Sequence, residues 1–236
     1  MDIKKLTDKI YYLPHNPEFD RPLLGYIKGS KYNMMIDAGT SDKHVEEFNN
    51  GLLKNNLKNP DFVAITHWHW DHTFGMHAVN GVTIAHEKTN EKLHELKNQE
   101  WSEQAMKERV EQGKEIEFKN EEFRNEYKDL NEIKIITADI IVDKELVFNL
   151  GDVTAHIFHV EAPHSDDSML IYVPEEKILF IGDSTSEDFY NNHYLDKDKL
   201  NSLIKTLESI NFTHCLLGHT DPLKKSDILG YLNTLL

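Results

Sequence analysis

The sequence has little of what marks secreted or membrane proteins. It contains a single cysteine, Cys215, so no disulfide can form within the chain. No apolar run approaches the roughly 20 residues that a membrane-spanning helix needs. The first residues also lack the apolar core of a signal peptide. We therefore expect a cytoplasmic protein that is not embedded in a membrane.

Positive charge is also scarce. The chain has 26 Lys and Arg against 41 Asp and Glu, which gives a net charge of −15. Such a field repels nucleic-acid backbones and anionic lipid surfaces. We therefore expect a small-molecule substrate, with no long nucleic acid and no membrane as partner. The sequence leaves the oligomeric state open, with a homodimer as one option.

Apolar strand segments alternate with amphipathic helices in both halves of the chain. One helix is capped by Ser41 and carries apolar residues at helical spacing, and another follows Asp196. This alternation predicts a layered α/β fold. No linker or low-complexity stretch interrupts it, so we expect a single domain over residues 1–236. Strands are predicted at residues 10–13, 24–27, 32–36, 62–65, 82–85, 139–142, 146–150, 153–159, 168–173, 177–181 and 214–217.

The segment at about residues 87–131 differs from the rest. It is highly charged, favours helices and has almost no strand signals. Leu93 and Leu96, and then Met106 and Val110, give only weak apolar stripes. We predict two or three helices inserted in the fold, lying over the active site. The charged residues of the insertion are interpreted as solvated helix faces.

The most informative motif follows the strand at 62–65. It has the pattern His-x-His-x-Asp-His and is made of His67, His69, Asp71 and His72. Imidazole and carboxylate groups are the ligands that suit zinc and similar cations. Three more residues of these types follow later strands, and a glycine precedes two of them. These further candidate ligands are His164, Asp183 and His219.

This order of residues resembles the metallo-β-lactamase superfamily, in its dinuclear form. The resemblance implies a four-layer αβ/βα sandwich with the metals at one edge. It also implies that His67, His69 and His164 hold one ion, that Asp71, His72 and His219 hold the other, and that Asp183 bridges them. Members that cleave β-lactams carry Cys or Ser in place of Asp183, which argues against an antibiotic substrate. The second histidine of the motif, His69, favours two Zn²⁺ ions, with iron or manganese as alternatives.

Two neighbouring cations can share one water and ionise it near neutral pH. We therefore expect a hydrolase in which a hydroxide bridging two zinc ions cleaves a small-molecule ester, lactone or thioester. Asp71 is the expected catalytic residue, because its carboxylate can orient that hydroxide. A phosphodiesterase of the same superfamily and a diiron redox protein remain as alternatives.

Four further residues are candidates for supporting roles. Asp37 follows the strand at 32–36 and could accept a hydrogen bond from a metal-bound histidine, or cap the helix that starts near Asp42. Tyr190, His193 and Tyr194 lie in the loop after Asp183 and could donate hydrogen bonds to substrate, or pack that loop. Of the two tryptophans inside the motif, we expect one in the core and one at the pocket.

Overall fold

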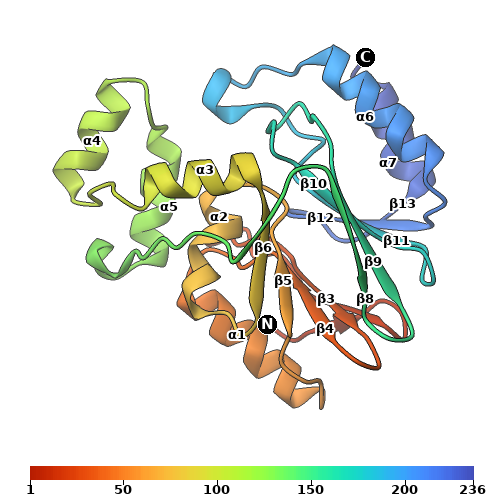
Figure 1. The fold of residues 1–236 in the computed structure, drawn as a ribbon. Helices are drawn as coiled ribbons and strands as arrows, with labels where there is room; N and C mark the ends of the chain where they lie inside the picture. Colours follow the sequence, from red (N-terminus) through yellow and green to blue (C-terminus); the bar gives the residue numbers. More distant parts are fainter.

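The computed structural model describes all 236 residues and contains two mixed β-sheets with helices on their outer faces (Figure 1). The first sheet has seven strands in sequence order, and the second has six in the order β13-β12-β11-β10-β9-β8. The first comprises β1 (Lys4–Lys5), β2 (Ile10–Leu13), β3 (Leu24–Lys28), β4 (Asn33–Ile36), β5 (Phe62–Ala64), β6 (Val82–His86) and β7 (Ile140–Val142). The second comprises β8 (Glu145–Asn149), β9 (Thr154–His159), β10 (Met169–Val173), β11 (Ile178–Gly182), β12 (His214–Leu217) and β13 (Leu223–Lys224).

Parallel pairing in both sheets determines where loops meet. Strands β4, β5, β6 and β7 run parallel, and so do β11 and β12. Parallel neighbours need a crossover connection, and their C-terminal ends lie at the same edge of the sheet. The crossover after β4 contains α1 (Asp42–Lys54), and that after β5 contains α2 (Trp70–Thr73) and η1 (Phe74–Ala78). The loops after β4 and β5 therefore lie side by side.

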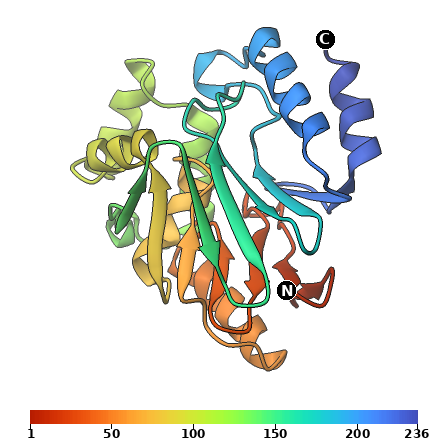
Figure 2. The same cartoon turned by 45° about the vertical axis from the view of Figure 1, so that its right-hand side comes forward.

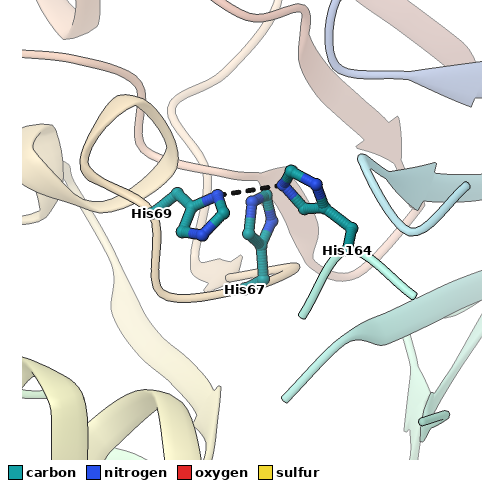
Figure 3. Close-up of side chains that lie close together, drawn as sticks. All are labelled: His67, His69 and His164. Atoms are coloured by element: carbon teal, nitrogen blue, oxygen red, sulfur yellow. Dashed lines mark hydrogen bonds between the residues drawn. The ribbon is translucent and has the colours of Figure 1, made fainter. Parts of the chain in front are cut away.

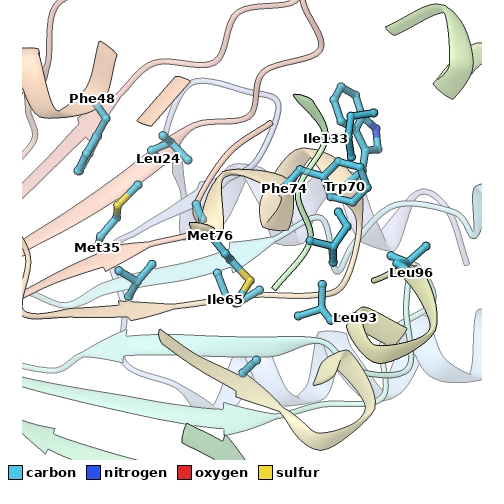
Figure 4. Close-up of a cluster of buried hydrophobic side chains, with 14 of the residues drawn as sticks. Leu24, Met35, Phe48, Ile65, Trp70, Phe74, Met76, Leu93, Leu96 and Ile133 are labelled. Atoms are coloured by element: carbon cyan, nitrogen blue, oxygen red, sulfur yellow. The ribbon is translucent and has the colours of Figure 1, made fainter. Parts of the chain in front are cut away.

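Three apolar clusters correspond to the three interfaces between four layers. On β4, Met35 faces the helices outside the first sheet, whereas Met34 and Ile36 face the second sheet. The first cluster also contains Phe48 of α1 (Figure 4). The third contains Leu203 and its neighbours, where α6 (Lys197–Ser209) and α7 (Lys225–Asn233) cover the second sheet (Figure 2). This layer order is the predicted αβ/βα sandwich.

The predicted insertion lies between β6 and β7 and forms three helices. They are α3 (Glu87–Leu96), α4 (Glu103–Glu111) and α5 (Glu117–Glu126), followed by the short η2 (Leu130–Glu132). Trp101, Met106 and Phe123 join the first apolar cluster, so the insertion is packed against the core. The interpretation of its charges as solvated was wrong for three residues, because Glu115, Lys119 and Glu126 are buried.

The remaining differences from the predicted elements are small. Strands β1 and β13 were not predicted, because two residues are too few to show an alternating pattern. Among all the helices, none has the length and apolar character required to cross a membrane.

Candidate metal centre and substrate cavity

The motif residues lie at the C-terminal end of β5, where the chain turns into α2. His67 and His69 come from the connecting loop, and Asp71 and His72 from the first turn of α2. All four side chains are buried. The other predicted ligands follow β9, β11 and β12, so loops from both sheets converge here.

Three histidines form the first candidate group, with ligand atoms that all lie within 4.8 Å of one another. They are His67, His69 and His164 (Figure 3). His164 Nε2 lies 2.9 Å from His69 Nδ1. The other nitrogen of His164, Nδ1, lies 2.8 Å from the carbonyl oxygen of Glu187, to which it can donate. That hydrogen bond leaves His164 Nε2 free to face the group.

Asp71, His72, Asp183 and His219 form the second candidate group. Asp71 Oδ2 lies 3.1 Å from both His72 Nε2 and His219 Nε2. Asp183 Oδ2 lies 3.4 Å from His72 Nε2 and 3.2 Å from His219 Nε2. The same oxygen is 3.9 Å from His164 Nε2 in the first group. Asp183 therefore lies between the two groups.

The two groups differ in electrostatics. Burial, and then the neighbouring histidines, hold the pKa of His67 and His69 well below the usual value. Burial acts the same way on His72, but the carboxylates of Asp71, Asp37 and Asp183 outweigh it and raise its pKa. Burial opposes ionisation of Asp71, yet His72 and His219 outweigh it and lower the pKa of Asp71. The second group therefore combines carboxylates with histidines, whereas the first group consists of histidines alone.

The donor atoms fit a pair of cations. His67 Nε2 and His72 Nε2 are buried and make no hydrogen bond within the protein, although His72 Nε2 lies 3.1 Å from Asp71 Oδ2. Buried polar atoms nearly always have a partner, which is another protein group, a water or a metal. Nitrogen and carboxylate oxygen atoms are also the ligand set that zinc prefers.

Asp37 and Thr66 connect two of these histidines to the sheet. Asp37 Oδ2 lies 2.8 Å from His72 Nδ1, and the Thr66 amide donates to Asp37 Oδ1 over 2.7 Å. The Thr66 hydroxyl donates to Asp37 Oδ2 over 2.9 Å and lies 3.1 Å from His67 Nδ1. Such contacts fix the ring orientation of metal-binding histidines. The alternative role of Asp37 as a helix cap was wrong, because Ser41 caps α1.

Two glycines leave space for the site. Gly182 has a φ of +50°, in the left-handed region that favours glycine. A Cβ added there would lie 2.6 Å from the Thr66 hydroxyl oxygen. A Cβ added at Gly218 would lie 2.2 Å from Asp183 Oδ1. Close packing therefore requires glycine before both Asp183 and His219, and at Gly182 the backbone geometry requires it as well.

A cavity of about 630 Å³ opens beside the first group. His69 and His164 lie on one wall, and the insertion and Tyr190 provide others. Trp68 also lines the cavity while Trp70 is buried in the core, as expected for the two tryptophans. The insertion therefore borders the space next to the candidate metal centre.

The three predicted loop residues have different surroundings. The ring of Tyr190 is 5.3 Å from that of His69, and Tyr190 lines the cavity. The side chain of His193 is 65% exposed and lies 3.5 Å from the Glu187 carboxylate. Tyr194 is also exposed, and neither it nor His193 lines the cavity. A substrate contact by these residues stays a prediction, for which Tyr190 has the most favourable position.

Sequence reasoning missed Thr66, Asp20 and Lys119. Asp20 Oδ1 lies 3.7 Å from His219 Nδ1, and burial together with Asp71 raises the pKa of Asp20 to about 7. Thr66 precedes the motif directly, which was an available signal. Asp20 and Lys119 are far from the motif in sequence and carry no such signal.

Comparison with known proteins agrees with this geometry. The family profile described as the Metallo-beta-lactamase superfamily matches residues 22–207. The chain is 24% identical over 190 residues to the acyl-coenzyme A thioesterase MBLAC2 of Homo sapiens, and equally to that of Bos taurus. These alignments cover 76% of this chain and 64% of the relatives, so the chain spans less than two thirds of their length.

Solved structures share the fold at low sequence identity. The sec-alkylsulfatase Pisa1 from Pseudomonas sp. has a TM-score of 0.70 and 15% identity, covering 98% of this chain and 40% of that one. A metallo-beta-lactamase from Pontibacter korlensis has a TM-score of 0.65 and 17% identity, covering 98% of both chains. These similarities confirm the predicted αβ/βα sandwich.

Proposed function

Because the chain belongs to the metallo-beta-lactamase superfamily, we propose that it is a metal-dependent hydrolase with two zinc ions. Its substrate would be a small-molecule ester, lactone or thioester. The observation that carries this proposal is the position of Asp183. One of its carboxylate oxygens lies within 3.9 Å of nitrogens from both ligand groups, where a bridging ligand is needed.

The two ligand groups indicate which side chains would hold each ion. His67, His69 and His164 would hold one ion, and Asp71, His72 and His219 the other, with Asp183 shared. When bound, the pair of cations would lower the pKa of water and polarise the carbonyl oxygen of the substrate.

Other chemistry falls to the protein's own residues. The low pKa of Asp71 keeps its carboxylate ionised at neutral pH, so it can accept a hydrogen bond from the attacking water and orient it. Asp37 holds the ring of His72 through the Nδ1 contact. Burial raises the pKa of Tyr190 against the opposing effect of Lys119, so its hydroxyl remains a donor. The rings of Trp68 and Tyr190 lie 5.0 Å apart and give the cavity an aromatic lining on the side of His69.

Within this substrate class, a thioester is the first to test. The support comes from the curated relatives, which are acyl-coenzyme A thioesterases at 24% identity. We expect cleavage of the C–S bond by water, which gives a carboxylic acid and a thiol. Esters and lactones place the same kind of carbonyl carbon before the same attacking water, so they belong in the same assay.

The test combines metal analysis with a panel of substrates. We expect two zinc ions per chain and hydrolysis of chromogenic thioesters or esters. Two iron ions with visible absorption would instead indicate a redox protein. Hydrolysis of bis-4-nitrophenyl phosphate alone would indicate a phosphodiesterase.

A pair of variants tests the site directly. His69→Ala removes a ring from the first group, so we expect it to abolish turnover in a folded protein. His94→Ala is the matched control, because His94 is exposed on α3 and does not line the cavity. Full activity of the His69→Ala protein would contradict the proposal.

A further inference from the structure

Lys119 is a buried lysine that the proposed hydrolysis does not use. It lies on α5 of the insertion, and its side chain is only 3% exposed. Its Nζ lies 5.2 Å from the ring centre of Phe123, 5.5 Å from that of Tyr190 and 6.0 Å from that of Trp68. Lysine is almost never buried in this way unless it is paired.

The pairing of Lys119 is incomplete. Its Nζ lies 2.5 Å from Glu115 Oε1, which is its only carboxylate partner within 4 Å. Glu115 Oε2 is also bound, by Arg109 Nε at 3.1 Å. Two cations therefore share one carboxylate, and Arg109 Nη2 is buried without a partner. This cluster has an excess positive charge in a protein whose net charge is −15.

Lys119 remains a cation at neutral pH. Burial lowers its pKa, but the ion pair with Glu115 opposes this effect, and the pKa is raised overall. A buried charge that lacks full compensation is destabilising, so the fold carries an energetic cost here. An anion bound next to Lys119 would compensate this charge.

The cluster faces the candidate metal centre across the cavity. Lys119 and Tyr190 line the cavity together with His69 and His164. Tyr190 is close to both Lys119 and His69, because its ring centre lies 5.5 Å from the Lys119 Nζ and 5.3 Å from the ring centre of His69. A substrate whose reacting carbonyl lies at the metal centre would therefore need only a short chain of atoms to reach Lys119.

Most of the carboxylates that line the cavity already have partners. Asp166 pairs with Lys199, and Glu95 pairs with Lys92. Asp167 accepts from the Thr89 hydroxyl over 2.6 Å. Glu91 has no ion-pair partner within 4 Å, and it lies on α3. Lys119 therefore pairs only with Glu115, because none of these other carboxylates lies within 4 Å of its Nζ.

We infer that Lys119 is a specificity-determining residue that binds an anionic group of the substrate, a carboxylate or a phosphate, near the bond that is cleaved. This inference rests on the proposed function and narrows its substrate class to anionic esters and thioesters. The lysine supplies a charge-assisted hydrogen bond, and the Tyr190 hydroxyl is a second donor on the same wall. Because the net charge of the protein repels anions, a local cation is needed to hold one.

Kinetics with matched thioesters test the inference. The probes are the N-acetylcysteamine thioesters of succinate, which ends in a carboxylate, and of succinamate, which ends in a neutral amide of the same size. We expect the native enzyme to prefer the carboxylate by about tenfold or more in kcat/KM, as for a charge-assisted hydrogen bond. In Lys119→Met that preference should disappear. Lys107→Met, on an exposed lysine of α4 outside the cavity, should keep it.

Binding measurements separate this inference from the proposed hydrolysis. Titration calorimetry of the zinc-loaded protein would use succinate and glycerol 3-phosphate, with succinamide and glycerol as neutral counterparts. We expect one of the two anions to bind Lys119→Met about tenfold or more weakly than the native protein, and the identity of that anion distinguishes carboxylate from phosphate. A protein that binds the anion but hydrolyses nothing would refute the hydrolase alone. Equal affinity in both proteins would overturn the role of Lys119.

A second variant keeps the test decisive if Lys119→Met does not fold. Glu115→Gln removes the charge that competes for Lys119 and keeps the size of the side chain. We expect it to tighten binding of the same anion severalfold, an effect opposite in sign to that of Lys119→Met. Unchanged or weaker binding in a folded Glu115→Gln protein would overturn the inference.

Discussion

Gly218 offers the sharpest test of the candidate metal centre. It lies between β12 and His219, and an added Cβ would lie 2.2 Å from Asp183 Oδ1 and 3.0 Å from His72 Cε1. Its φ is not in the left-handed region, so alanine would be strained only by lack of space. Its carbonyl oxygen accepts from the Leu23 amide over 2.6 Å, which holds the backbone in place. In Gly218→Ala the carboxylate of Asp183 must therefore move.

The size of the effect follows from this overlap. A carbon and an oxygen that are not bonded rarely approach closer than about 3 Å, so Asp183 has to move by roughly 1 Å. Overpacking of this kind destabilises a protein by about 1–3 kcal/mol. Displacing a group that orients or bridges metal ligands weakens metal binding by about 10–100-fold. We expect a folded Gly218→Ala protein that binds zinc in this range and has lost most of its hydrolytic activity.

The assay compares Gly218→Ala with Gly230→Ala. Gly230 lies within α7, and a Cβ added there meets nothing within 4 Å. Alanine should stabilise that helix by about 0.5–1 kcal/mol and leave metal binding unchanged. Zinc affinity would be measured by competition with a chromophoric chelator, and folding by circular dichroism. If Gly218→Ala bound two zinc ions with native affinity, Asp183 would not be the shared ligand.

Two further predictions concern stability. Arg21 donates from two nitrogens to Glu126, at 2.8 Å and 3.0 Å, and the side chain of Glu126 is fully buried. Thermal or urea unfolding of Arg21→Ala should show a free energy of unfolding that is lower by about 3–5 kcal/mol. Adding Glu126→Gln should restore much of that loss. A loss below about 1 kcal/mol would refute the pairing. Burial, and then Arg21, hold the pKa of His44 well below 6.5. In the unfolded protein His44 can therefore take up a proton that it cannot take up in the native protein. The stability of the protein should fall as the pH falls below about 6.5. The difference in unfolding free energy between native protein and His44→Gln should shift by about 1.4 kcal/mol between pH 7.5 and 5.5, and a constant difference would show that His44 does not titrate in this way.

The sequence predicts the metal-binding arrangement because its signal is local. His67, His69, Asp71 and His72 lie within six residues, and each further ligand follows a strand with a clear apolar pattern. Parallel strands place such loops at one edge of a sheet, so the topology brings the residues together. The strand boundaries agree with the structure to within one or two residues for the same reason.

The residues of the cavity wall could not be predicted from the sequence, because their burial depends on contacts between segments that are far apart along the chain. From the sequence alone, the spacing of Glu115 and Lys119 indicates a solvent-exposed ion pair, four residues apart on a charged helix. They are buried only because Trp101 and Phe123 of the insertion enclose them, together with Tyr190 from a loop of the second sheet. Nothing in the local pattern of α5 specifies those contacts. Charge patterns on helices therefore predict exposure poorly where a second element covers the helix.

The insertion and the candidate metal centre have different roles, although they are packed together. The candidate ligands come from loops at the ends of sheet strands and from the first turn of α2, whereas α3 and α5 line the cavity and supply no candidate ligand. Deleting the insertion would remove Trp101, Met106 and Phe123 from the first apolar cluster, so it would disturb the fold as well as the cavity. Single substitutions on the cavity side, such as Lys119→Met, change the wall and leave that cluster in place. Substrate preference should therefore change independently of zinc content along this wall.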